Sequence, residues 1–85
     1  MPNLDALEEE LIAFIQTEVN PNVTQLGPDT DLLGGETLDS LGILAVIGYL
    51  EDRFGFEIEV EEVSLESFRT VATIRALVVD KLRAN

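Results

Sequence analysis

Two adjacent residues near the middle of the chain, Asp39 and Ser40, have side chains and positions that suit a chemical role. Asp39 precedes a run of apolar residues, and its carboxylate can accept the free N–H groups in the first turn of a helix. Ser40 then presents a hydroxyl at the start of that helix. The chain contains no histidine and no Gly-x-Ser-x-Gly turn, so the sequence offers nothing that would activate this hydroxyl as a catalytic nucleophile. There is also no cysteine, so any thiol that the protein uses must be attached to it.

The helix that would position Ser40 runs to Phe54 and stops at Gly55. At about 100° per residue, its side chains fall on two opposite faces. One face is a narrow stripe that we predict to be core: Ile43, Val46, Ile47, Leu50 and Phe54. The other is apolar over two turns, where a surface helix is normally charged: Leu41, Leu44, Ala45, Gly48 and Asp52. A small domain that exposes such a patch usually binds something through it. We interpret the second face as a partner-docking surface, with burial against a neighbouring helix as the alternative.

Two further long helices are predicted, one on each side of this central helix. The first spans residues 3–19, is capped by Asn3 and ends before Asn20-Pro21, because the residue that precedes a proline is pushed out of the helical region. Its apolar residues recur at helical spacing: Leu4, Leu7, Leu11, Ile12, Phe14, Ile15 and Val19. The last helix spans residues 71–83 and is capped by Thr70.

The connections between these helices are long. Residues 21–38 should form a loop with a short helical turn near residues 31–33, anchored by Val23, Leu26, Leu32, Leu33 and Leu38. Residues 56–60 alternate apolar and acidic side chains, but a single strand would have no partner. We therefore predict an extended loop in which Phe56, Ile58 and Val60 point inward, followed by a short helix over residues 61–67. The predicted fold is all-α: a small four-helix bundle of three main helices and one short one, with a long first loop.

Composition narrows the possible partners. The 85 residues make a single domain, residues 1–85. The net charge of −12, from 17 acidic and 5 basic residues, disfavours nucleic acid and anionic membranes and suits partners with basic patches. The N-terminus lacks a signal-peptide pattern, and no apolar stretch is long enough to cross a bilayer. We expect a cytoplasmic monomer with no membrane insertion.

Residues 29–34 faintly suggest a calcium-binding loop. The EF-hand pattern requires an oxygen ligand where Leu33 stands, an apolar residue where Glu36 stands and a bidentate glutamate where Ser40 stands. All three positions fail. Since histidine and cysteine are also lacking, we predict no metal site.

The segment Leu38-Asp39-Ser40-Leu41 resembles the Asp-Ser-Leu motif of acyl and peptidyl carrier proteins. The resemblance extends from about Asp31 to Val79 and includes three flanking segments: Asp31-Leu32-Leu33, Leu50-Glu51-Asp52-Arg53-Phe54 and Phe68-Arg69-Thr70-Val71. It implies that the fold is of the acyl-carrier-protein type and that the chain is a carrier, not an enzyme. It also implies that a phosphopantetheinyl transferase esterifies Ser40 with 4′-phosphopantetheine, whose thiol holds an acyl or aminoacyl cargo as a thioester. Asp39 and Leu41 complete the motif, Asp39 either as a structural cap or as a residue that the transferase recognises.

The position of Ser40 suits that modification, because a phosphodiester there would lie at the positive end of the helix. The stretch from Gly42 to Leu50 carries no charge, whereas carriers of fatty-acid synthesis typically have acidic residues there. This difference favours polyketide, nonribosomal peptide or related specialised pathways. The partners would then be an acyl- or aminoacyl-activating ligase or transferase and a downstream synthase, condensing or tailoring enzyme. Two alternatives remain: an acyl carrier protein of fatty-acid or lipid synthesis, and an unmodified acidic interaction module that docks through the second helix.

The size of the cargo is predicted from packing. Close packing of the core stripe and of inward side chains such as Ile58, Phe68 and Ile74 would leave little interior room for a long chain. We therefore expect a small, solvent-exposed unit, with an aminoacyl group ahead of a short hydroxylated or carboxylated acyl group.

Overall fold

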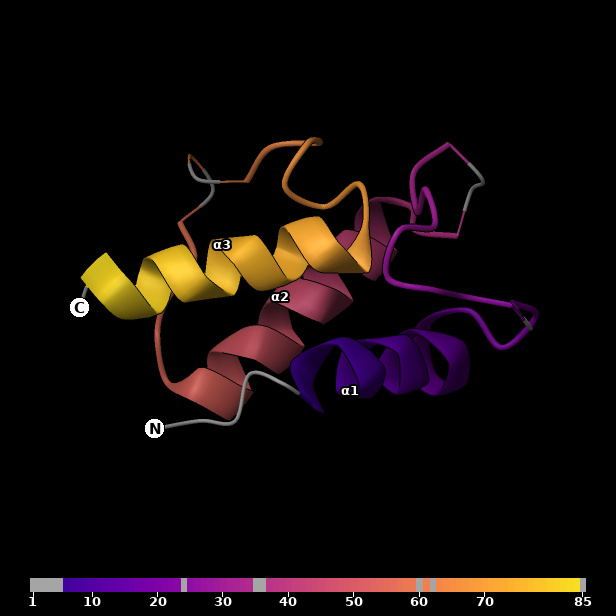
Figure 1. Cartoon of the computed structure of the whole chain (residues 1–85), viewed down its shortest axis with the longest axis horizontal. Coiled ribbons are helices and arrows are strands. Elements are labelled where there is room, and N and C mark those ends of the chain that lie inside the picture. Colours follow the sequence, from indigo (N-terminus) through magenta and orange to yellow (C-terminus); the bar gives the residue numbers. More distant parts are fainter. Residues whose placement is uncertain (1–5, 24, 35–36, 60, 62, 85) are drawn as a thin grey trace.

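The computed structural model describes residues 6–23, 25–34, 37–59, 61 and 63–84. Its regular elements are α1 (Leu7–Phe14), η2 (Ile15–Val19), α2 (Ser40–Phe54) and α3 (Val71–Ala84). No strand occurs among the described residues, so the all-α prediction is confirmed. In Figure 1, α2 runs obliquely between α1 and α3, and the loop after η2 leads back to the start of α2.

The first helix changes its winding before it ends. α1 continues directly into η2, a π-helical turn in which the Asn20 N–H donates to the Ile15 carbonyl, five residues earlier, at 2.8 Å. The Thr17 hydroxyl donates to the Ala13 carbonyl at 2.7 Å. The predicted end at Val19 is confirmed, but the π turn was not predicted. The proposed cap Asn3 and the core residue Leu4 lie outside the described residues.

The predicted limits of α2 are confirmed at both ends. Asp39 has an extended backbone, and its side chain accepts the Gly42 N–H at 2.8 Å, so it is the helix N-cap. Gly55 ends the helix in the left-handed conformation (φ 76°), which glycine adopts without a Cβ penalty.

A polar and aromatic cluster joins α1 to the C-terminal half of α2. The Arg53 guanidinium lies 2.8 Å from the Glu10 carboxylate, and the Tyr49 ring stacks on Phe14 with 4.5 Å between ring centroids. Burial, followed by the negative charge of Glu10, raises the pKa of Tyr49 above its usual value. The Tyr49 hydroxyl donates to Glu10 Oε2 at 3.5 Å.

Backbone hydrogen bonds tie the long loop before α2 to Arg69 and to the first turn of α3. The Leu32 N–H donates to the Arg69 carbonyl at 2.7 Å, and the Ala72 N–H donates to the Pro28 carbonyl at 3.0 Å. Leu32 and Leu38 are buried, while the other predicted anchors, Val23, Leu26 and Leu33, are partly buried. The expected helical turn near residues 31–33 is found as a hydrogen-bonded turn over residues 32–34.

The segment between α2 and α3 differs in part from its prediction. Residues 55–59 form no regular secondary structure, and Phe56 and Ile58 are buried as expected; Val60 lies outside the described residues. The described residues between 61 and 67 form no α-helix. Instead, successive i→i+3 backbone bonds link Ser67 to Ser64, Phe68 to Leu65 and Arg69 to Glu66. The Ser64 hydroxyl accepts the Ser67 N–H, which stabilises this tighter turn locally.

The start of α3 has reciprocal caps. The Thr70 hydroxyl accepts the Thr73 N–H at 3.1 Å, and the Thr73 hydroxyl accepts the Thr70 N–H at 3.0 Å. The predicted cap and the predicted first residue, Val71, are both confirmed.

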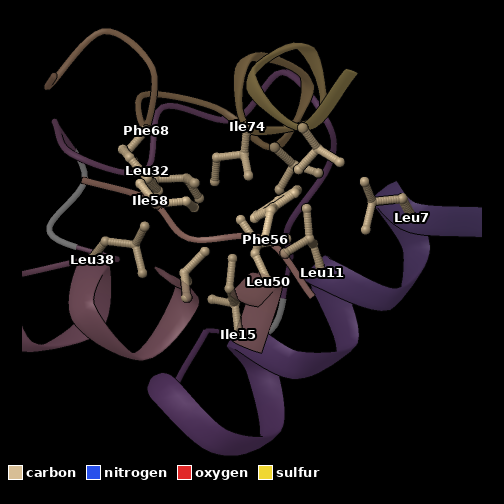
Figure 2. Packing of buried hydrophobic residues seen from close by; sticks show 13 residues of the cluster. Leu7, Leu11, Ile15, Leu32, Leu38, Leu50, Phe56, Ile58, Phe68 and Ile74 are labelled. Carbon is tan, nitrogen blue, oxygen red and sulfur yellow. The ribbon is translucent and has the colours of Figure 1, made fainter. Parts of the chain in front are cut away.

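The core lies where the three helices and the loops between them meet (Figure 2). Its buried apolar residues come from every part of the described chain: Leu7, Leu11, Ile15, Leu32, Leu38, Val46, Leu50, Phe56, Ile58, Phe68, Val71, Ile74 and Val78. Of the stripe predicted for α2, only Val46 and Leu50 are fully buried. Ile43, Ile47 and Phe54 pack against the cluster from its edge and remain partly exposed.

Candidate functional site

Ser40 is the first residue of α2, and its side chain is exposed. Asp39 satisfies the Gly42 N–H, so the cap does not use the serine hydroxyl. A helix N-terminus favours negative charge, because its free N–H groups carry partial positive charge. The position therefore combines an accessible hydroxyl with surroundings that stabilise a phosphodiester.

Close packing holds the first turn of α2 in place. Gly42 is buried, and a Cβ at this position would lie 3.0 Å from Val19 Cγ1 and 3.1 Å from Leu38 Cδ2. Glycine thus lets the start of α2 approach the end of η2 and the preceding loop. This role of Gly42 was not predicted from the sequence, although a glycine within an otherwise apolar helix was the available signal.

The five residues of the predicted docking face are all exposed: Leu41, Leu44, Ala45, Gly48 and Asp52. Leu41 is 76% exposed and Leu44 is 63% exposed, so no neighbouring helix of the described chain covers them. The alternative in which this face belongs to the core is wrong. Its role in docking remains a prediction.

An open groove of about 410 Å³ begins at Ser40 and follows α2. Its lining comes from two parts of the chain: Ser40, Ile43, Leu44, Ile47 and Glu51 on α2, and Ile58 and Val63 in the segment after it. The prediction that the core stripe fills the interior is confirmed only in part for Ile43 and Ile47, which pack against the core cluster and also line this groove. Glu51 and Val63 were not predicted to line the groove. Their proximity to the other lining residues depends on how the segment after Gly55 folds back against α2.

A second, smaller hollow of about 270 Å³ lies on the other side of the start of α2. The end of η2 contributes Glu18 and Val19, and the start of α2 contributes the remainder: Asp39, Leu41, Gly42 and Ala45. The two carboxylates make this hollow acidic, whereas the groove has mainly aliphatic walls. Ser40 therefore lies between two surfaces of different chemistry.

The loop over residues 29–34, which resembles a calcium-binding loop, is held by backbone hydrogen bonds to the Asp31 side chain. The Asp31 carboxylate accepts the Gly34 N–H at 2.8 Å and the Leu33 N–H at 3.1 Å, and it lies 3.5 Å from the Arg69 guanidinium. The bond from Gly34, followed by the weaker contributions of Leu33 and Arg69, outweighs desolvation and lowers the pKa of Asp31.

Across the residues that the structure describes, no three His, Cys, Asp or Glu side chains group as metal ligands. In the same residues, no helix has the length and apolarity needed to cross a membrane.

Comparisons with known proteins agree with this geometry. Residues 9–78 match the protein family described as "Phosphopantetheine attachment site". Among solved structures, the chain is similar to apo KstB-PCP, with 37% sequence identity and a TM-score of 0.69, over 92% of this chain and 89% of the other. No curated protein matches the chain. The family match covers most of the sequence, so the chain belongs to the phosphopantetheine-attachment family of acyl and peptidyl carrier proteins.

Members of this family are carriers and not enzymes, and they hold 4′-phosphopantetheine covalently on a serine. They act together with phosphopantetheinyl transferases and biosynthetic enzymes. The residues at the start of α2 fit that group: an exposed hydroxyl, a capped helix N-terminus for the phosphate, and a groove that opens beside it.

Proposed function

We propose that Ser40 receives the phosphopantetheine and that the protein carries acyl or aminoacyl units for discrete enzymes of a polyketide, nonribosomal peptide or related specialised pathway. The observation that carries this proposal is the exposed Ser40 hydroxyl at the Asp39-capped start of α2, beside the groove. When attached, the group supplies a thiol that holds the unit as a thioester. The protein's own residues fix the attachment point and present it to partners in the cytoplasm.

The other serines of the chain suit the modification less well. The sequence has three serines, Ser40, Ser64 and Ser67. The Ser64 and Ser67 hydroxyls lie 3.0 Å apart, and Ser64 also accepts the Ser67 N–H. Both lie in a turn and not at the start of a long helix, so neither has a helix dipole to stabilise a phosphodiester.

The docking face supports the assignment to a specialised pathway. Leu41 and Leu44 are exposed and follow Ser40 on α2, and no charge occurs between Gly42 and Leu50. A partner that binds there must present an apolar surface, with basic residues outside it to match the net charge of −12. The 37% identity with KstB-PCP favours a peptidyl cargo over a fatty-acyl one. A transferase, an activating ligase and a downstream condensing or tailoring enzyme would use this face in turn.

The assignment of Ser40 is tested by intact mass after incubation with coenzyme A and a broad-specificity phosphopantetheinyl transferase. The wild type should gain the mass of one phosphopantetheine group. Ser40→Ala should gain nothing and keep its fold, because loss of an exposed hydroxyl at a helix start costs at most about 1 kcal/mol. Ser64→Ala and Ser67→Ala are the controls and should load fully. Loading of the Ser40→Ala variant would refute the assignment, and a wild type that never loads would favour an unmodified interaction module.

A further inference from the structure

The groove beside Ser40 has a defined direction. Its α2 lining residues follow one another at helical spacing from Ser40 to Glu51, which lie eleven residues apart in the sequence. At about 1.5 Å per residue, the two ends are separated by about 16 Å along the helix axis. An extended pantetheine arm has a similar length, judged by the reach of an extended chain per bond. A unit on an arm that starts at Ser40 and follows the groove would thus reach the level of Glu51.

Glu51 differs from the rest of the lining. It is the charged member of the described lining, and the walls between it and Ser40 are formed by aliphatic side chains, among them Ile47 and Ile58. Glu51 Oε2 accepts the Ile58 N–H at 2.8 Å, which holds the carboxylate at the groove. The side chain is partly buried, and within the described part of the chain no salt bridge engages it. Its second oxygen, Oε1, takes no part in the bond to Ile58.

A partly buried carboxylate beside apolar walls discriminates between charges. Attraction to a cation is stronger there than on an open surface, because the effective dielectric constant is lower. A second carboxylate at the same place would be repelled by Glu51, and the net charge of −12 adds to that repulsion. A purely alkyl unit would contact the walls but would leave Glu51 without a counter-ion.

We propose that this groove binds a carried unit that bears a primary ammonium group, with Glu51 as its counter-ion. The proposal rests on the proposed function, since it requires the arm on Ser40. It extends that function by naming an amine-bearing unit as the preferred cargo and by placing it in the groove and not free in solvent. Carboxylate-bearing units of the same length are excluded from the groove and remain in solvent.

The test compares two units of equal size on the holo protein. β-Alanyl and butanoyl groups differ in that an ammonium group replaces a terminal methyl, and both can be attached as stable amide analogues of the thioester. Intact mass first confirms loading. Two-dimensional ¹H–¹⁵N spectra then follow the Ile58 amide, and ¹³C spectra follow the Glu51 carboxylate. We expect both signals to shift in the β-alanyl form by several times more than in the butanoyl form.

Matched variants separate the role of Glu51 from that of general acidity. Glu51→Gln keeps an oxygen that can accept the Ile58 N–H but removes the charge, so the β-alanyl-specific shift at Ile58 should be lost. Glu57→Gln removes one negative charge from an exposed position outside the groove lining and the docking face, and it should preserve that shift. Equal shifts for the two units, or equal effects of the two variants, would overturn the proposal while leaving Ser40 as the attachment site. Failure to load would instead overturn the proposed function.

Discussion

The inward and outward faces of α2 are both built mainly from aliphatic side chains, yet Val46 and Leu50 are fully buried while Leu41 and Leu44 are 76% and 63% exposed. The two faces therefore cannot be distinguished by composition. The helical period determines which side chains lie on each face. The inward residues contribute free energy of folding through burial. The outward leucines contribute little to it, and the exposed apolar patch that they form supports the proposal that this face binds a partner.

Each face of α2 also carries one glycine, and their surroundings differ in the same way. Gly42 is packed against Val19 and Leu38, whereas a Cβ at Gly48 would meet nothing within 4 Å. The two glycines provide a second, independent measure of how tightly each face is packed. Matched substitutions on the two faces therefore test the comparison directly.

The largest difference is expected for the same truncation at two leucines. Leu50→Ala removes a fully buried side chain and should lower the free energy of unfolding by about 2–5 kcal/mol. Leu44→Ala should change it by no more than about 0.5 kcal/mol, because Leu44 is exposed. Urea denaturation followed by circular dichroism measures both values. Equal losses would show that Leu44 is part of the core after all.

The glycine pair should respond in opposite directions. Gly42→Ala forces a methyl group against Val19 and Leu38 and should cost about 1–3 kcal/mol of unfolding free energy. Gly48→Ala enters open space in a helix interior and should add about 0.5–1 kcal/mol. The urea concentrations at the unfolding midpoints of the two variants show the direction of each change in stability. A stabilising Gly42→Ala would mean that the start of α2 can move away from η2 without loss.

Partner binding should depend on the outward face of α2, whose leucines are exposed. Leu44→Glu should slow transfer to or from a cognate partner enzyme about tenfold, as expected for loss of one apolar contact worth about 1.4 kcal/mol. Its helicity and melting temperature should match those of the wild type. Leu65→Glu is the control, since Leu65 is also exposed (67%) but lies outside α2. A similar loss of transfer in both variants would indicate a general effect of added negative charge.

The smallest effect is expected from salt. Twelve uncompensated negative charges repel one another, so added NaCl should raise the melting temperature, most steeply at low ionic strength. The outward face carries only Asp52 as a charge, so Leu44→Ala and the wild type should respond equally. Differential scanning calorimetry over a salt series measures this response. A melting temperature that is independent of salt would show that the acidic groups are already paired, or lie too far apart to repel one another measurably.

Sequence reasoning succeeded where one residue determines a local structure. Asp39 and Gly55 define the ends of α2, and Thr70 defines the start of α3, through capping groups that act within a few residues. It was less successful where the outcome depends on distant segments. Ile43 and Ile47 line a groove because the segment with Ile58 and Val63 leaves them partly uncovered, and periodicity within α2 contains no information about that.

Bonds made by polar side chains explain the remaining differences between prediction and structure. In residues 64–69, the Ser64 hydroxyl bonds the Ser67 N–H and favours tight turns where a short helix was predicted. Glu10, in the acidic run of α1, bonds Arg53 across to α2, and the helical period alone does not predict such a contact between helices. The candidate attachment residue was identified from its motif, whereas the shape of its surroundings required the fold.

The π turn η2 has a consequence for chain length. Its bonds span one residue more than those of an α-helix, so it accommodates an additional residue within a helix without displacing the loop and α2. Deleting Thr17 should therefore yield an uninterrupted α-helix that still places Val19 against Gly42. A deletion within α1 would instead rotate Leu7 or Leu11 out of the core. We therefore expect the protein to tolerate the loss of one residue at this point. A cooperative melt of the Thr17 deletion, with unchanged amide shifts in α2, would show it.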